Sequence, residues 1–227
     1  EFWMSQGVQR IVLARELTFE EIHGLREKLP PEMEFEAFVQ GAMCISYSGR
    51  CLLSNFMIER DANRGACAHP CRWKYSLVEE QRPGEYYPIE EDERSTYILN
   101  SKDLCMIEHI DDIMNSGIDS LKIEGRMKSE FYVAVTVRAY RVAIDMIERG
   151  EEISEETLEK LLSEVCSVSH RDYCTGFYLG DRGSQIYETS SYKRETDFIG
   201  TVDSCEADDD GNYILTMTQR GTFSVGD

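Results

Sequence analysis

The chain has 227 residues, with 24 Lys and Arg against 43 Asp and Glu, so its formal net charge is −19. Hydrophobic residues make up 41%, including 12 Tyr and 9 Phe, which is enough for a packed core and excludes an intrinsically disordered chain. The acidic balance weighs against broad, sequence-blind adhesion to nucleic acid, although it leaves room for a local basic site. The sequence has no uninterrupted run of about eighteen apolar residues, so it predicts no membrane-spanning helix.

The N-terminal part of the chain predicts two strands around one helix. Residues 10–15 form a short apolar run with charged ends, typical of a buried strand. Thr18 and Glu21 form a capping box, which predicts a helix that continues to about Leu29, before two prolines. Residues 34–40 alternate apolar and polar positions and predict a second strand.

The next part of the chain predicts two further strand–helix steps. Residues 95–100 predict a third strand, followed by a helix that opens at residues 101–104 and ends near Gly117. Residues 120–124 predict a fourth strand, and a long amphipathic helix then ends at Gly150. Four such steps indicate a parallel sheet with crossover helices, and both a doubly wound sheet and half of a (β/α) barrel fit the pattern.

The sequence changes character near residue 150. We predict three parts: residues 1–150 as the α/β domain, residues 151–175 as a helical connector, and residues 176–227 as the start of a small β domain. Ser154 predicts a helix N-cap, and residues 198–202 and 213–217 flank a polar turn as in a β-hairpin. The chain begins without Met and ends in what reads as another strand from Arg220 onward, so we expect it to be part of a longer protein.

Four cysteines lie close together in the sequence. Six residues separate Cys44 from Cys51, three separate Cys67 from Cys71, and fifteen separate the two pairs. Thiolates are soft ligands that suit zinc or an iron–sulfur cluster, and the wide first gap favours an iron–sulfur cluster over structural zinc. Cys105 follows a strand region and is an alternative fourth ligand. Clustered thiols of this kind fit a reducing cytoplasm.

Charged side chains at the predicted strand ends are candidates for catalysis and binding. Lys122, Glu124 and Arg126 follow one strand, and in a barrel such residues gather on the catalytic face. Lys122 and Glu124 would equally form a structural ion pair, whereas Arg126 and Lys128 suit a carboxylate or phosphate. Basic residues and Trp73 surround the cysteines in the sequence, and they form either a local RNA-binding surface or an ordinary solvated face. The basic residues are Arg50, Arg60, Arg64, Arg72 and Lys74.

Three segments carry a resemblance to a known family. The pattern Glu36-x-Phe38-x-x-Gly-Ala-Met-Cys44, continued by Gly49, Cys51, Leu53 and Ser54, resembles the signature of the collagenase-like peptidase U32 family. Residues 120–126 and 100–103 are also similar to that family. The resemblance implies the C-terminal half of a TIM-like (β/α) barrel followed by a small β domain, and a [4Fe–4S] cluster held by four cysteines.

The resemblance implies two different activities. One branch of the family takes part in prephenate-dependent 5-hydroxylation of the wobble uridine in tRNA, so tRNA, a small anionic metabolite and a partner protein are expected. Other members are named peptidases. The sequence contains no HExxH zinc site and no Gly-x-Ser-x-Gly elbow, although a cysteine nucleophile with a distant histidine stays open as an alternative. Hydroxylation is therefore the favoured prediction.

Overall fold

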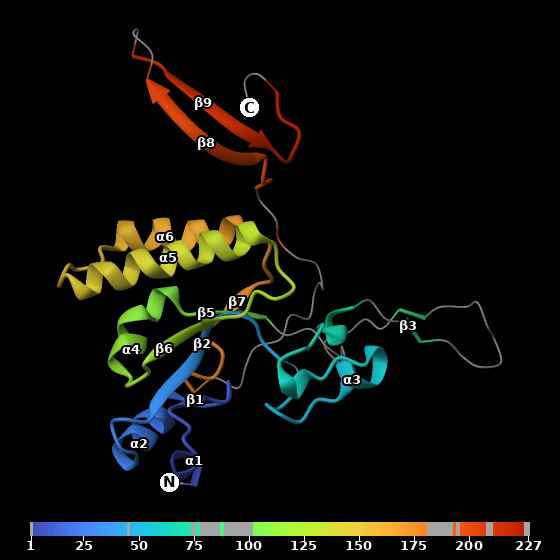
Figure 1. The fold of residues 1–227 in the computed structure, drawn as a ribbon, viewed down its shortest axis with the longest axis vertical. Coiled ribbons are helices and arrows are strands. Elements are labelled where there is room, and N and C mark those ends of the chain that lie inside the picture. The colour runs from blue at the N-terminus through green and yellow to red at the C-terminus, as the bar shows by residue number, and fades with distance from the viewer. Residues whose placement is uncertain are drawn as a thin grey trace.

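The computed structural model describes most of the chain. The described residues are 2–44, 46–73, 76–77, 87–88, 102–180, 193, 196–207 and 211–224. Figure 1 shows a sheet with its helices, a cysteine-bearing segment that contains α3 to one side, and a hairpin of β8 and β9 that extends away from the helices α5 and α6. The elements are therefore grouped around one sheet, with two outlying parts.

The helices and strands have the following bounds. The α-helices are α1 (Phe2–Ser5), α2 (Phe19–Lys28), α3 (Leu53–Ile58), α4 (Ile110–Asn115), α5 (Glu130–Glu148) and α6 (Glu155–Ser167). The short 3₁₀ helices are η1 (Ala62–Arg64), η2 (Pro70–Arg72) and η3 (Ile107–His109). The strands are β1 (Arg10–Val12), β2 (Glu34–Ala42), β3 (Ser76–Leu77), β4 (Tyr87–Pro88), β5 (Asp103–Cys105), β6 (Ser120–Ile123), β7 (Tyr173–Cys174), β8 (Gly200–Ala207) and β9 (Tyr213–Gln219).

Strand β2 is the centre of the main sheet. It pairs in parallel with β1, where Glu36 lies opposite Val12, and in parallel with β6, where Glu36 lies opposite Ser120. At its C-terminal end β2 pairs with β5 in the antiparallel sense, and β5 pairs in parallel with β7. The fold class is therefore α/β, as predicted, with a mixed rather than a purely parallel sheet.

The expectation of half a TIM-like barrel is not confirmed. The described strands form an open five-stranded sheet, and no closed barrel is found among them. The antiparallel pairing of β5 on β2 departs from the all-parallel order that a (β/α) barrel requires. The predicted third strand at residues 95–100 lies outside the described residues, as does most of the long connection before it.

The predicted helix opening at residues 101–104 is wrong. Asp103, Leu104 and Cys105 instead form the buried strand β5, because they pair with both Gln40–Ala42 and Tyr173–Cys174. The helical part of this segment begins only at Ile107. The last predicted strand is also wrong over its described part, because residues 220–224 are not in a strand.

The helices confirm the local sequence signals. Thr18 caps α2 through the predicted capping box, in which Thr18 Oγ1 accepts from the Glu21 backbone and a Glu21 carboxylate oxygen accepts from the Thr18 backbone. Ser129 and Ser154 cap α5 and α6 in the same way with their hydroxyl groups. The predicted hairpin is also confirmed as β8 and β9. None of the described helices has the length and apolar composition that crossing a bilayer requires.

The core lies between the sheet and helices α2, α4, α5 and α6. Phe35 and Val39 on β2 pack with Ile110 and Ile113 on α4, and all four side chains are buried. Burying each such side chain contributes about 1.5–3 kcal/mol. The sheet is thereby fixed on one side, and its strand ends are held in place.

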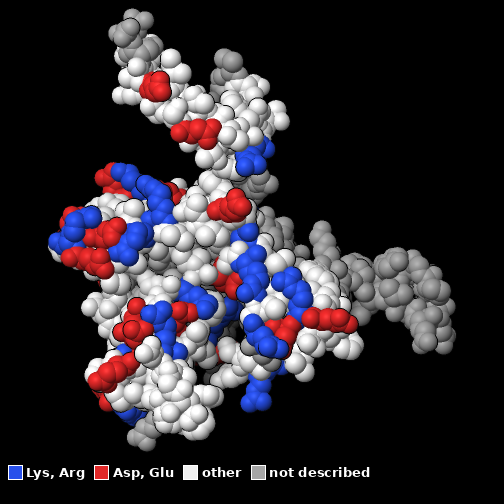
Figure 2. Space-filling model, viewed as in Figure 1, with Lys and Arg blue, Asp and Glu red and all other residues white. Residues whose placement is uncertain are grey.

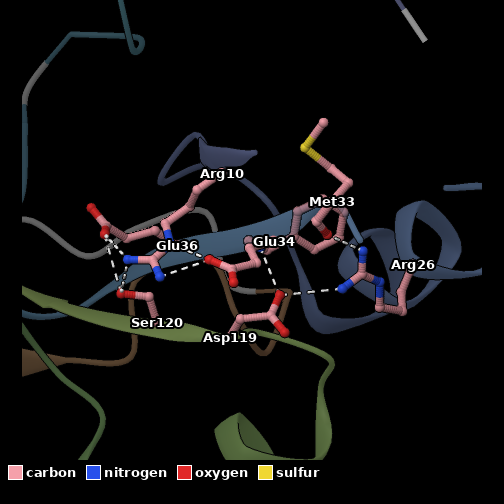
Figure 3. Close-up of polar contacts among 8 residues, drawn as sticks. Arg10, Arg26, Met33, Glu34, Glu36, Asp119 and Ser120 are labelled. Atoms are coloured by element: carbon pink, nitrogen blue, oxygen red, sulfur yellow. Dashed lines mark hydrogen bonds and ion pairs between the residues drawn. The ribbon is translucent and has the colours of Figure 1, made fainter. Parts of the chain in front are cut away.

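The N-terminal ends of the strands are joined by charged groups (Figure 3). Arg10 on β1 pairs with Glu34 at 2.7 Å and with Glu36 at 3.7 Å. Asp119, just before β6, accepts from the Phe35 backbone N–H at 2.7 Å and pairs with Arg26 of α2 at 3.2 Å. These contacts set the register of β1, β2 and β6, so this end of the sheet is structural and the opposite end is available for chemistry.

Candidate active site

A pocket of about 590 Å³ lies at the C-terminal ends of β1, β2 and β6. The three strands are parallel, so the residues that follow them meet at the same edge of the sheet. Arg15 follows β1, Met43 and Cys44 follow β2, and Glu124 follows β6. The cysteine-bearing segment that contains α3 forms the opposite wall. This arrangement brings residues that are far apart in the sequence to one site.

All four predicted ligand cysteines line this pocket. Cys44, Cys51, Cys67 and Cys71 are free thiols, and each is at least partly accessible to solvent. Neighbouring protein atoms desolvate the Cys44 thiol and raise its pKa, and the adjacent Cys51 and Cys67 add to this shift. Arg15 acts in the opposite direction, because its positive charge favours the thiolate.

The donor set fits a metal cluster in kind and number. Four sulfur atoms on one pocket match the ligands of structural zinc or of a [4Fe–4S] cluster. Within the described residues, no three Cys, His, Asp or Glu side chains meet at metal-binding distance. All four cysteines belong to the segment after β2, where the described regular elements include α3 and two short 3₁₀ turns.

The sheet side of the pocket is charged. Lys122 Nζ donates to Glu36 at 2.5 Å, and this contact lowers the pKa of the Glu36 carboxyl. Glu124 accepts from the Arg126 backbone N–H at 2.9 Å and faces Arg15 at 4.0 Å. Lys122 and Glu124 therefore each have a different partner, and the structure records no ion pair between them in the described part of the chain.

Phe38 of β2 forms the floor between two cations. The guanidinium carbon of Arg15 lies 3.9 Å from the centre of the Phe38 ring, and Lys122 Nζ lies 5.4 Å from the same centre. Such cation–π contacts hold the positive groups against the ring. The result is a wall with two fixed cations that line the same pocket as the cysteines, each of which also faces a carboxylate, Glu124 for Arg15 and Glu36 for Lys122.

Arg126 reaches from the end of β6 towards the cysteine-bearing segment. Its terminal nitrogen lies 3.7 Å from the position that a Cβ atom on Gly65 would occupy. None of the described carboxylates forms an ion pair with its guanidinium group. A guanidinium without a carboxylate partner has the geometry to bind a carboxylate or phosphate in a bidentate manner.

Two predicted residues lie elsewhere. Lys128 pairs with the buried Asp103 at 3.5 Å and donates to the Ser169 carbonyl at 2.8 Å, so it ties the segment before α5 to β5. It lines a neighbouring hollow of about 780 Å³, which shares Glu124 with the cysteine pocket. Cys105 is buried on β5 beside Tyr140 and does not line the cysteine pocket.

The sequence reasoning missed two features of the pocket. Tyr47 lies at its edge, and the only signal was an aromatic residue in the loop between Cys44 and Gly49. The stacking of Arg15 on Phe38 was also missed, because it joins residues on different strands. The pocket nevertheless contains every predicted catalytic residue, namely Lys122, Glu124 and Arg126.

The model of peptidase family U32 matches residues 1–188. The chain belongs to peptidase family U32. The match covers all of the pocket residues, from Val12 to Arg126. No solved structure gives a significant match.

Relatives of the chain are named either as tRNA hydroxylation proteins or as a collagenase. The chain is 41% identical to tRNA hydroxylation protein P1 of Bacillus subtilis, over 100% of this chain and 53% of the relative. It is 36% identical to tRNA hydroxylation protein P of Escherichia coli, over 100% of this chain and 57% of the relative. It is 34% identical to a collagenase of Porphyromonas gingivalis, over 78% of this chain and 44% of the relative. The chain thus spans about half the length of these proteins.

Proposed function

We propose that this U32 protein takes part in prephenate-dependent 5-hydroxylation of the wobble uridine in tRNA, in the cytoplasm, as an iron–sulfur protein. The observation that carries the proposal is the convergence of four free cysteines and the charged residues Lys122, Glu124 and Arg126 on one pocket. Two relatives that cover the whole chain are named tRNA hydroxylation proteins, which supports the choice of reaction.

In this proposal the cysteines hold the cofactor. Cys44, Cys51, Cys67 and Cys71 would ligate a [4Fe–4S] cluster, with zinc as the alternative and with Cys105 as the alternative fourth ligand. A bound cluster supplies one-electron chemistry or a Lewis-acidic iron. Neighbouring protein atoms raise the pKa of the Cys44 thiol, although the residue stays exposed to solvent.

The charged wall binds and positions the small molecule. Arg126 and Arg15 would bind the carboxylates of prephenate, with Lys122 contributing positive charge from the other side of Phe38. Glu124 is the carboxylate in this wall that would accept a proton from the bound molecule. Its carboxylate contacts the Arg126 backbone N–H and the Arg15 side chain, so its orientation is fixed.

The cluster assignment is tested by purifying the protein without oxygen and measuring its iron content and visible spectrum. We expect iron in the parent protein and its loss in Cys44→Ser and Cys71→Ser. Cys205→Ser is the matched control, because this exposed cysteine lies on β8, away from the pocket. A colourless, iron-free parent that contains one zinc would overturn the cluster assignment.

The reaction is tested in cells. Hydroxyuridine in tRNA is measured in a deletion strain that carries the parent gene, the Arg126→Gln variant or no copy. An unchanged level in the deletion strain would remove the hydroxylation proposal. The collagenase relative and the family name support peptidase activity as the second candidate, which predicts gelatin cleavage that is lost in Cys44→Ala.

A further inference from the structure

The segment beside the cysteine pocket exposes large apolar side chains. We call residues 47–64 the rim segment. Tyr47 is 65% exposed and Phe56 is 86% exposed, although both are aromatic residues that would gain from burial. Leu52 and Met57 are exposed in the same segment. Exposed large apolar side chains that gather on one segment beside a pocket are typical of a binding surface.

Tyr47 is held on a fixed turn. The Arg50 N–H donates to the Tyr47 carbonyl at 3.0 Å, and Gly49 has the positive φ of 76° that the turn requires. The Ser48 N–H donates to the Glu16 carboxylate at 2.8 Å, which fastens the turn to the segment after β1. Tyr47 therefore lines the pocket from a turn that two hydrogen bonds and the backbone of Gly49 define.

The rim segment also carries cations without carboxylate partners. Arg50, Arg60 and Arg64 are exposed, and none of them forms an ion pair with a described carboxylate. Arginines elsewhere in the described part of the chain do form such pairs; they include Arg10, Arg26, Arg138, Arg141 and Arg149. Figure 2 shows Lys and Arg over this side of the molecule, next to a few acidic residues.

This contrast points to an external anion. In a chain with 43 acidic and 24 basic residues, an arginine readily finds a carboxylate within its own protein. Three arginines that pair with none of the described carboxylates, on the same segment as exposed aromatic rings, suit a ligand that offers both negative charge and flat apolar faces. Single-stranded RNA has both, because guanidinium groups bind its phosphates and aromatic rings stack on its bases.

We propose that the rim segment binds single-stranded RNA, with the Tyr47 ring stacking on the nucleotide that enters the cysteine pocket. The proposal rests on the hydroxylation function above and adds where the RNA lies. Arg50 is three residues from Tyr47 and contacts the phosphate beside the stacked base. Arg60 and Arg64 contact neighbouring phosphates, and Phe56 supplies a second stacking surface outside the pocket.

The test measures binding of a uridine-containing single-stranded oligonucleotide in which 2-aminopurine replaces one base, since stacking quenches its fluorescence. We expect Tyr47→Ala to weaken binding about five- to 100-fold and to remove the quenching, whereas Tyr47→Phe keeps both. Trp3→Ala is the matched control, because Trp3 is an exposed aromatic residue on α1, away from the pocket. Arg50→Gln and Arg64→Gln should each reduce the salt dependence of binding by about one phosphate contact.

The outcomes of these experiments distinguish a failure of the RNA-binding proposal from a failure of the proposed hydroxylation function. If the parent binds RNA and Tyr47→Ala binds equally well with the same quenching, the placement on the rim segment is wrong. If the parent binds no single-stranded RNA, or if Tyr47→Ala and Trp3→Ala lose binding equally, the proposal is also overturned. The hydroxyuridine measurement in cells is independent of these results, so the hydroxylation function stands or fails by itself. Stable capture of a protein by the same surface, without RNA binding, would likewise contradict the proposal.

Discussion

The backbone carbonyl oxygen of Glu124 lies 2.4 Å from the position that a Cβ atom at residue 41 would occupy. Only glycine allows this approach, and Gly41 also has a φ of 112°, a conformation that other residues rarely adopt. The Glu124 N–H donates to the adjacent Gln40 carbonyl at 2.9 Å. The end of β2 thereby holds Glu124 at the pocket. Gly41, which makes this approach possible, is three residues before Cys44.

Replacing Gly41 with alanine should therefore destabilise the protein. The positive φ alone costs about 1–3 kcal/mol, and the clash with a backbone atom adds to that cost because no flexible side chain can move away. Urea denaturation measures the change. Gly24→Ala is the control, because Gly24 lies within α2 with open space around it, and alanine should stabilise that helix by about 1 kcal/mol. Equal stability of parent and Gly41→Ala would contradict the prediction.

The Glu36–Lys122 pair predicts a change of stability in acid. The folded pKa of Glu36 lies below its usual 4.5, mainly because Lys122 donates a hydrogen bond to it. The pair's contribution is therefore fully present above about pH 4.5 and is lost as the pH falls through the lowered pKa. Glu36→Gln should cost about 1–2 kcal/mol at neutral pH, and its difference from the parent should vanish in strong acid.

The control for this titration is Glu151→Gln. The Glu151 pKa is also lowered, by Arg149, but this pair is fully exposed to solvent. Exposed pairs contribute little, so the variant should follow the parent at every pH. A constant difference between Glu36→Gln and the parent from neutral pH to strong acid would show that the effect does not come from the charge of Glu36.

Local signals in the sequence were sufficient for part of the fold. The Thr18–Glu21 capping box acts over three residues, so it could be recognised without knowing the tertiary structure. The strand at Asp103–Cys105 could not, because its pairing partners at residues 40–42 and 173–174 are more than sixty residues away. The same limit applies to the site: the cysteines were visible by spacing, whereas the Lys122 partner Glu36 is 86 residues away.

Tyr140 predicts a loss of stability through a buried hydroxyl group. On α5, its hydroxyl donates to the Val39 carbonyl at 2.8 Å and accepts from the Met106 N–H at 2.9 Å. Tyr140→Phe should destabilise the protein by about 0.5–1.5 kcal/mol, because the hydroxyl bonds are lost while the Met106 N–H still donates to the Val39 carbonyl at 3.0 Å. Urea denaturation is the measurement, and Tyr213→Phe on the exposed face of β9 is the control. Equal effects of the two substitutions would contradict the role of the hydroxyl.

Cys105 should resist alkylation in the folded protein. Burial raises the pKa of its thiol to about 12, so very little thiolate is present at about pH 8. Iodoacetamide should modify the exposed Cys205 quickly and Cys105 only after unfolding, as followed by mass spectrometry of peptides. The sign of the shift adds a second expectation: stability from the neutral thiol is present below pH 9.0 and is lost as the pH rises towards 12. Modification of Cys105 at the rate of Cys205 in native protein would show that it is accessible, and would strengthen its case as the fourth cluster ligand over Cys71.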